Sequence, residues 1–148
     1  MNGMNIIVRR IAQLMVPSIL LLGIYIVLQG HLTPGGGFAG GVMIAGGYIL
    51  YVLAFGLREQ EMINKKNLAS IAESIGIFLF WSLAIWGLLL GSVFFYNVIA
   101  KVNPGQRFHL FSGGIIPLCN IVIGIEVAAA LFAVFILLVS WEGKEGEE

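Results

Sequence analysis

Residues 30–41, GHLTPGGGFAGG, decide how this chain folds, because they separate two long apolar stretches. Pro34 cannot continue a helix, and three consecutive glycines, residues 35–37, follow it directly. Each flanking stretch is long enough for a helix to cross a lipid bilayer, which takes about 20 residues. The segment therefore predicts a tight turn between two membrane-spanning helices.

The composition of the 148-residue chain excludes an ordinary water-soluble domain. Hydrophobic residues make up 59% of it and charged residues 11%, and the mean hydropathy is +0.97. Soluble domains carry about 25% charged residues. The formal net charge of zero gives no basic surface for a nucleic acid. The single cysteine, Cys119, excludes an internal disulfide and a cysteine-based metal cluster, and we expect it to fill space in a helix.

Four apolar segments are long enough to span a membrane, and a short acidic tail follows them. The spans cover roughly residues 11–29, 38–57, 74–96 and 114–140, and the tail covers residues 141–148. A β-barrel needs short strands of alternating polarity, whereas these runs are continuous. We therefore expect one all-α membrane domain, an integral bundle of about four transmembrane helices.

The positions of lysine and arginine predict that both termini of this multi-pass protein lie on the cytoplasmic side of the cell (inner) membrane. The side that holds the termini carries Arg9, Arg10, Arg58, Lys65, Lys66 and Lys144. The other side carries only Lys101 and Arg107. The first span is too long for a secretory signal and has no small-residue cleavage site, so we expect it to be retained.

Small residues in the second span form a regular pattern. Gly37, Gly41 and Ala45 recur at four-residue spacing, with Gly36 and Gly40 beside them, which favours close packing against another helix. Residues 35–40 also match G-x-G-x-x-G, but that fingerprint requires a preceding strand within a βαβ unit. We therefore reject nucleotide binding here.

His31 is the titratable residue of the glycine-rich turn, and two roles for it stay open. An imidazole changes charge near neutral pH, so His31 and the turn could line a polar path. A histidine at a membrane surface can equally act as a hydrogen-bonding anchor. In the second case the turn serves only to reverse the chain and to start a closely packed helix.

Glu126 lies near the middle of the fourth span, where a charge costs about 2.5–3.5 kcal/mol on insertion scales. Its helical neighbours three and four residues away offer no partner, since they are Val122, Ile123, Ala129 and Ala130. The partner must come from another helix, another subunit, water or a bound cation. Glu126 is therefore a candidate for proton or cation passage, or alternatively for a bond between subunits.

Two further residues are candidates for an ion pathway. Glu73 opens the third predicted span, where a carboxylate suits a helix N-terminus, so we favour a capping role for it. Asn120 shares one face of the fourth span with Gly113, Pro117 and Gly124. That face lies about 120° around the helix from Glu126. The fourth helix is therefore expected to contact two different neighbours.

No catalytic set can be assembled from the polar residues. His109 and Arg107 lie in a predicted outer loop without a serine, carboxylate or second histidine to complete a site. The chain shows no metal-ligand spacing and no cofactor motif. We expect it not to be an enzyme by itself and to bind no cofactor, and its only metal to be a transient sodium ion at Glu126.

Two motifs resemble a known family. The first consists of Gly30, His31, Pro34, Gly35, Gly36, Gly37, Phe38, Gly40 and Gly41. The second is an I-P-x-x-N-x-x-x-G pattern in the last span, formed by Ile116, Pro117, Asn120 and Gly124. Together they resemble the MnhB or MrpB family over nearly the whole chain. The resemblance implies a subunit of a multisubunit sodium/proton antiporter, with other membrane subunits as its partners.

The resemblance also suggests which kind of complex the chain joins. The same module recurs in complexes related to respiratory complex I, including archaeal membrane-bound hydrogenases. Antiporter members tend to carry lysine where this chain has Glu126, which favours a hydrogenase-linked or sulfane-reductase-linked version. The alternatives are a stand-alone Mrp-type antiporter and a purely structural subunit. An independent transporter is disfavoured, because no internal repeat resembles inverted transporter halves.

Overall fold

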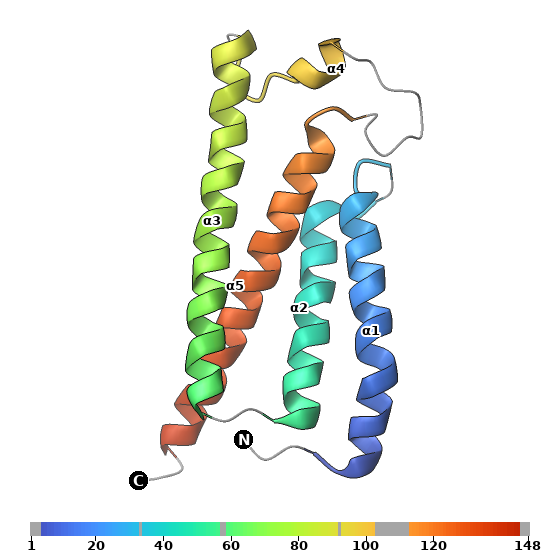
Figure 1. Ribbon diagram of the computed structural model, residues 1–148, viewed down its shortest axis with the longest axis vertical. Coiled ribbons are helices and arrows are strands. Elements are labelled where there is room, and N and C mark those ends of the chain that lie inside the picture. The colour runs from blue at the N-terminus through green and yellow to red at the C-terminus, as the bar shows by residue number, and fades with distance from the viewer. Residues whose placement is uncertain (1–3, 33, 57–58, 92, 103–112, 146–148) are drawn as a thin grey trace.

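The protein is a bundle of long helices, seen in a computed structural model that describes residues 4–32, 34–56, 59–91, 93–102 and 113–145 (Figure 1). The helices are α1 (Ile6–Leu28), α2 (Gly36–Phe55), α3 (Glu59–Gly91), the short α4 (Val98–Val102) and α5 (Ile116–Glu145). Four of them, α1, α2, α3 and α5, are long and apolar enough to cross a membrane. No strand occurs in these ranges. The predicted all-α bundle of about four membrane-spanning helices is confirmed.

The last helix lies inside the bundle rather than at its edge. α5 packs against α2 on one side and α3 on the other, and α1 packs mainly against α2 (Figure 1). Within the described ranges, the backbone of α3 contacts neither α1 nor α2. Both chain ends lie at the same end of the bundle, as an even number of spans requires (Figure 1). α5 therefore supplies the backbone contacts that link α3 to the α1–α2 pair, and α3 reaches α2 only through side chains in the described ranges.

The third helix is much longer than the sequence predicted. α3 begins at Glu59 rather than near residue 74 and runs for 33 residues, which is about 50 Å at 1.5 Å per residue. The hydrocarbon core of a bilayer is only about 30 Å thick. The charged residues before the span were expected to form a loop, but two apolar residues among them, Met62 and Ala69, are buried. That burial explains why the helix continues beyond the apolar run.

The other boundaries differ less from those predicted. α1 starts five residues before residue 11, α2 starts two residues before residue 38, and α5 continues five residues past residue 140. Pro17 lies inside α1 without ending it. The fourth span and the acidic tail therefore form one continuous helix as far as residue 145.

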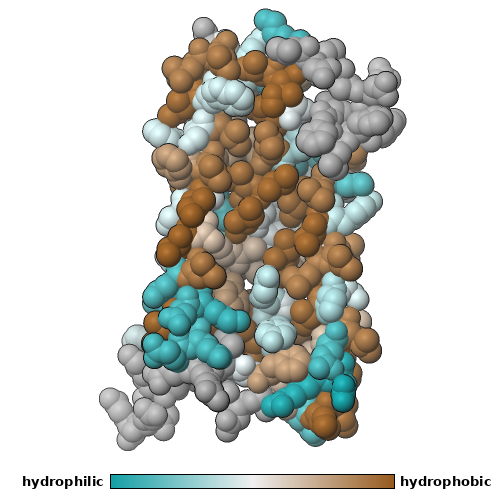
Figure 2. All heavy atoms as spheres, viewed as in Figure 1, coloured by the Kyte–Doolittle hydropathy of each residue, from teal (hydrophilic) through white to brown (hydrophobic). Residues whose placement is uncertain are grey.

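Most large apolar side chains point outward. The buried core consists of small clusters such as Val52, Met62 and Ile136, which join α2, α3 and α5. Exposed apolar residues such as Phe78, Leu89 and Trp141 cover the long faces of the helices. Figure 2 shows this apolar band across the middle of the molecule, with hydrophilic side chains gathered toward the end that holds the termini. Such a surface requires lipid or other membrane subunits around it.

Candidate functional site

The glycine-rich turn ends at the start of α2 in a conformation that favours glycine. Gly35 and Gly36 have φ angles of 130° and 65°, in the left-handed region where a side chain would be strained. Gly35 occupies the N-cap position and offers no side chain to the free N–H groups of the first turn. Asn120 of α5 supplies that acceptor, because the Gly37 amide donates to its Oδ1 at 3.4 Å. The start of α2 is thus capped by a residue 83 positions away.

The two family motifs pack directly against each other. A methyl group added to Gly41 would lie 2.7 Å from the carbonyl oxygen of Gly124 and 2.9 Å from Cβ of Val127. One added to Gly37 would overlap the backbone of Asn120. The backbones of α2 and α5 can approach this closely only because both positions lack a side chain. Gly37 and Gly41 of the small-residue pattern in α2 thus lie against the asparagine–glycine face of the last helix.

A second row of small residues joins α2 to α1. A methyl group on Gly40 would lie 2.7 Å from the carbonyl oxygen of Gly23. Gly46, by contrast, has no atom within 4 Å of the position that a methyl group would take. The glycines of α2 therefore serve different purposes, and only some of them are required for packing.

Glu126 points away from this contact and faces α3. A methyl group on Gly76 would lie 2.9 Å from Cβ of Glu126 and 3.2 Å from its Cα. α5 thus contacts α2 through Asn120 and α3 through Glu126, which confirms the prediction of two different neighbours. The sequence analysis did not single out Gly76, although an isolated glycine inside an apolar helix suggests a close contact.

Glu73 lies on the same side of α3 as Gly76, since the two residues are three positions apart. It is fourteen residues past the first residue of α3, so the predicted capping role is wrong. At that depth a helix has no free N–H groups for a carboxylate to accept. Glu73 and Glu126 therefore both border the α3–α5 contact, separated by about one helical turn. Both are partly exposed, and neither has a hydrogen-bond or ion-pair partner among the described residues.

His31 belongs to a separate part of the molecule. It lies beside Gly113 at the start of α5, where a methyl group on that glycine would be 3.3 Å from Cδ2 of the imidazole. Glu126 lies ten residues past the first residue of α5, Ile116, which is about 15 Å along the helix. His31 and Glu126 therefore do not form one site. In the same region Pro117 is buried, whereas Pro34 and Phe38 are exposed.

Asn97 is a structural residue that the sequence analysis missed. Its side chain donates to the carbonyl oxygen of Gly113 at 2.9 Å. Its Oδ1 accepts from the amides of Ala100 and Ile115 at 3.1 and 3.2 Å. Asn97 thus fixes α4 to the start of α5. The sequence did contain a signal for this role, because asparagine is a preferred N-cap residue and Asn97 directly precedes a helix-forming segment.

Sites for a metal or for catalysis are not evident in the described part of the chain. No group of three or more His, Cys, Asp or Glu side chains comes together there. His109 and Arg107, which the sequence placed in an outer loop, lie outside the described residues. The polar residues from which a function can be argued are Glu73 and Glu126, beside the α3–α5 contact, and Asn120, which caps α2.

Comparison with known proteins identifies the family. A family model for a domain related to the MnhB subunit of Na+/H+ antiporters matches residues 7–133. The chain belongs to the MnhB family. Both motifs and both carboxylates lie within the matched range. With its four span-capable helices, this member of the family is a multi-pass membrane protein.

The matches to individual relatives cover different shares of this chain and of each relative. An uncharacterized protein of Methanocaldococcus jannaschii is 37% identical over 79% of this chain and 45% of its own. A Staphylococcus epidermidis protein that bears the name antiporter subunit mnhB2 is 30% identical over 70% of this chain and 72% of its own. This chain thus spans about half of the archaeal relative.

A solved structure shares both fold and sequence with this member of the MnhB family. It is a chain in the membrane-bound sulfane sulfur reductase, an archaeal respiratory membrane complex. The TM-score is 0.64 at 31% identity, and the similarity covers 88% of this chain and 56% of that one. MnhB-type helices thus occur in a respiratory complex as well as in the proteins named for antiporters.

Proposed function

We propose that this chain is a non-catalytic membrane subunit of the sodium/proton-translocating module of a multisubunit complex. The observation that carries the proposal is the position of Glu126 in the middle of α5, against Gly76 of α3. Glu73 precedes that glycine by three positions on the same side of α3. A carboxylate at membrane depth is costly and is retained where it meets a partner, a cation or water. Family membership supports the same conclusion.

The chemistry of the pair suits a small hard cation or a proton. Carboxylate oxygens are ligands that hard cations prefer, and partly exposed side chains can exchange such an ion with their surroundings. Two carboxylates that border the same helix contact can both offer oxygen ligands to one cation. In this mechanism Glu126 binds sodium or relays a proton, and Glu73 supplies the second oxygen donor.

The sequence of the last helix supports a redox-linked complex over a stand-alone antiporter. In the resemblance described above, antiporter members tend to carry lysine at the position of Glu126, and an acid there requires complementary groups on neighbouring subunits. We propose a membrane-bound hydrogenase that couples hydrogen evolution to ion pumping. The similarity to a chain of the sulfane sulfur reductase supports a sulfur-reducing complex as the second candidate.

Identification of the accompanying subunits tests this assignment. The complex would be purified in mild detergent through a tag on this chain, and its subunits and nickel content would be measured. A nickel–iron hydrogenase large subunit with stoichiometric nickel supports the first assignment. A nickel-free preparation that reduces polysulfide supports the second, and a preparation of antiporter subunits without a redox enzyme refutes both.

Substitution of Glu126 separates the ion role from a purely structural role. In the intact complex, Glu126→Gln should abolish sodium-dependent activity while the subunit composition on a native gel stays unchanged. Glu126→Asp keeps a carboxylate and should retain part of the activity, and Glu61→Gln, at the exposed start of α3, should leave it unchanged. Normal coupling in Glu126→Gln would refute the ion role. Loss of subunits in that variant would identify Glu126 as a structural contact instead.

The orientation of the chain is part of the same proposal. With Lys65 and Lys66 near the end of the bundle that holds the termini, we place both termini in the cytoplasm. Each terminus would be labelled with a reporter that is active on one side of the membrane. A reporter that functions on the outer side at either terminus would overturn this orientation.

A further inference from the structure

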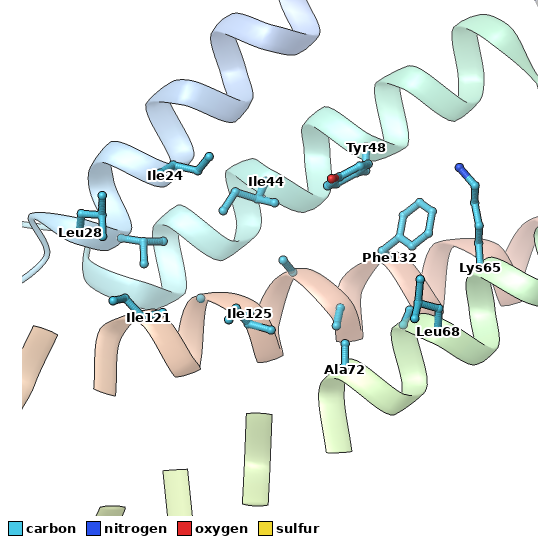
Figure 3. Close-up of a pocket in the computed structure, with 15 residues that line it drawn as sticks. Ile24, Leu28, Ile44, Tyr48, Lys65, Leu68, Ala72, Ile121, Ile125 and Phe132 are labelled. Carbon is cyan, nitrogen blue, oxygen red and sulfur yellow. The ribbon is translucent and has the colours of Figure 1, made fainter. Parts of the chain in front are cut away.

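A groove opens on one side of the bundle, where α3 stands apart from α1 and α2. Its volume is about 600 Å³. α5 forms its floor, and small residues there, such as Gly124, Ala128 and Ala129, leave the space open. Figure 3 shows apolar side chains from all four spans around it, including Ile24, Ile44 and Ile125. We call this feature the α5 groove.

One end of the α5 groove is polar. Lys65 of α3 and Tyr48 of α2 line it there, near Phe132 (Figure 3). The Lys65 Nζ lies 5.9 Å from the ring centroid of Tyr51, so its long side chain extends across the gap toward α2. Lys65 is eleven residues from Gly76 toward the start of α3, which places it about 16 Å nearer the end of the bundle that holds the termini. The groove is thus apolar along its length and positively charged where it nears the membrane surface.

We propose that the α5 groove binds an acyl chain of an anionic phospholipid whose phosphate contacts Lys65. The polarity of the groove matches such a molecule along its whole length. An ammonium group near the membrane surface attracts anionic headgroups, and the apolar walls suit a hydrocarbon chain.

The dimensions favour a lipid chain over a helix of another subunit. The lining residues of α5 run from Ile121 to Phe132, which is about 16 Å at 1.5 Å per residue and close to half of a 30 Å hydrocarbon core. A helix that crosses the whole core, about 30 Å thick, would extend well past this lining of about 16 Å. One leaflet's acyl chain therefore matches the groove in length.

Lipid retention by the full-length chain tests the proposal. The protein would be reconstituted in vesicles of equal parts phosphatidylglycerol and phosphatidylcholine with identical acyl chains. It would then be extracted in mild detergent, and the bound lipids would be counted by native mass spectrometry. We expect phosphatidylglycerol to be retained about five-fold over phosphatidylcholine, the factor that corresponds to one lysine at an anionic surface.

Two pairs of variants separate the headgroup contact from the acyl-chain contact. Lys65→Gln should abolish the preference for phosphatidylglycerol, while Lys66→Gln, which does not line the groove, should keep it. Ala128→Phe fills the groove and should remove both lipids, while Leu131→Phe on the exposed side of α5 should remove neither. The comparison of Lys65→Gln with Lys66→Gln still tests the headgroup contact if Ala128→Phe fails to fold.

Three results would overturn the proposal. One is equal retention of the two lipids by the unaltered protein. Another is an unchanged preference in Lys65→Gln. The third is capture of a subunit of the complex, instead of lipid, by a photo-crosslinking residue at position 128, which would identify a partner helix as the occupant.

Discussion

Replacement of Gly41 by alanine tests a close backbone contact between α2 and α5. The added methyl group would lie 2.7 Å from the carbonyl oxygen of Gly124 and 2.9 Å from Cβ of Val127. Ordinary contacts between such atoms are about 3.5 Å, so α2 and α5 must move apart by roughly 0.6–0.8 Å. A backbone carbonyl cannot rotate away as the end of a flexible side chain can. Gly41→Ala should therefore separate the two family motifs.

The magnitude follows from two opposing effects. Overpacking in a tightly packed interior costs typically about 1–3 kcal/mol. Alanine also favours a helix over glycine by about 1 kcal/mol or less, which offsets part of that cost. We expect Gly41→Ala to lower the free energy of unfolding by about 1–2 kcal/mol. The matched control is Gly46→Ala on the same helix, where no atom lies within 4 Å and only the favourable effect remains.

Cys119 provides the assay, since it is the single cysteine and is partly buried in α5. A thiol-reactive fluorophore would report its exposure during thermal unfolding in detergent. For a domain of this size 1 kcal/mol shifts the melting temperature by about 2–4 °C, so Gly41→Ala should lower it by about 2–8 °C. Gly46→Ala should leave it unchanged or raise it slightly. Equal melting temperatures for the two variants would refute direct backbone packing between α2 and α5.

Three further predictions concern single polar side chains. Asn120→Ala removes the acceptor of the Gly37 amide and should lower stability by about 1 kcal/mol in the same thermal assay; an unchanged melting temperature would show that this long hydrogen bond contributes nothing. Asn97→Ala removes three hydrogen bonds, so amide exchange should quicken in α4 and at the start of α5 but not in α1; uniform exchange would contradict its linking role. In the intact complex, Glu73→Gln should lower the apparent sodium affinity at least five-fold without abolishing turnover, and an unchanged affinity would exclude it from the ion site.

Local properties of the sequence were sufficient for the main outline of the fold. Membrane spans follow from apolar runs of about 20 residues, and the break at residues 30–41 follows from proline and glycine, so neither depends on distant parts of the chain. The two faces of the last span could also be derived, because the angle between Asn120 and Glu126 is fixed by helix geometry. The cost of a carboxylate at membrane depth singled out Glu126 without any knowledge of its surroundings.

The pairing of those faces was decided only by the tertiary structure. A helix in lipid is apolar on all sides, so its hydrophobic pattern does not show which neighbour it meets. The insertion of α5 between α2 and α3, the Asn120 cap on α2 and the glycine beneath Glu126 all depend on contacts between distant segments. The same limit explains the error at Glu73, because burial of Met62 against α2 and α5 extends α3 well beyond the apolar run that hydropathy detects. Sequence determined which segments enter the membrane and which residues are costly there, and packing decided what those residues face.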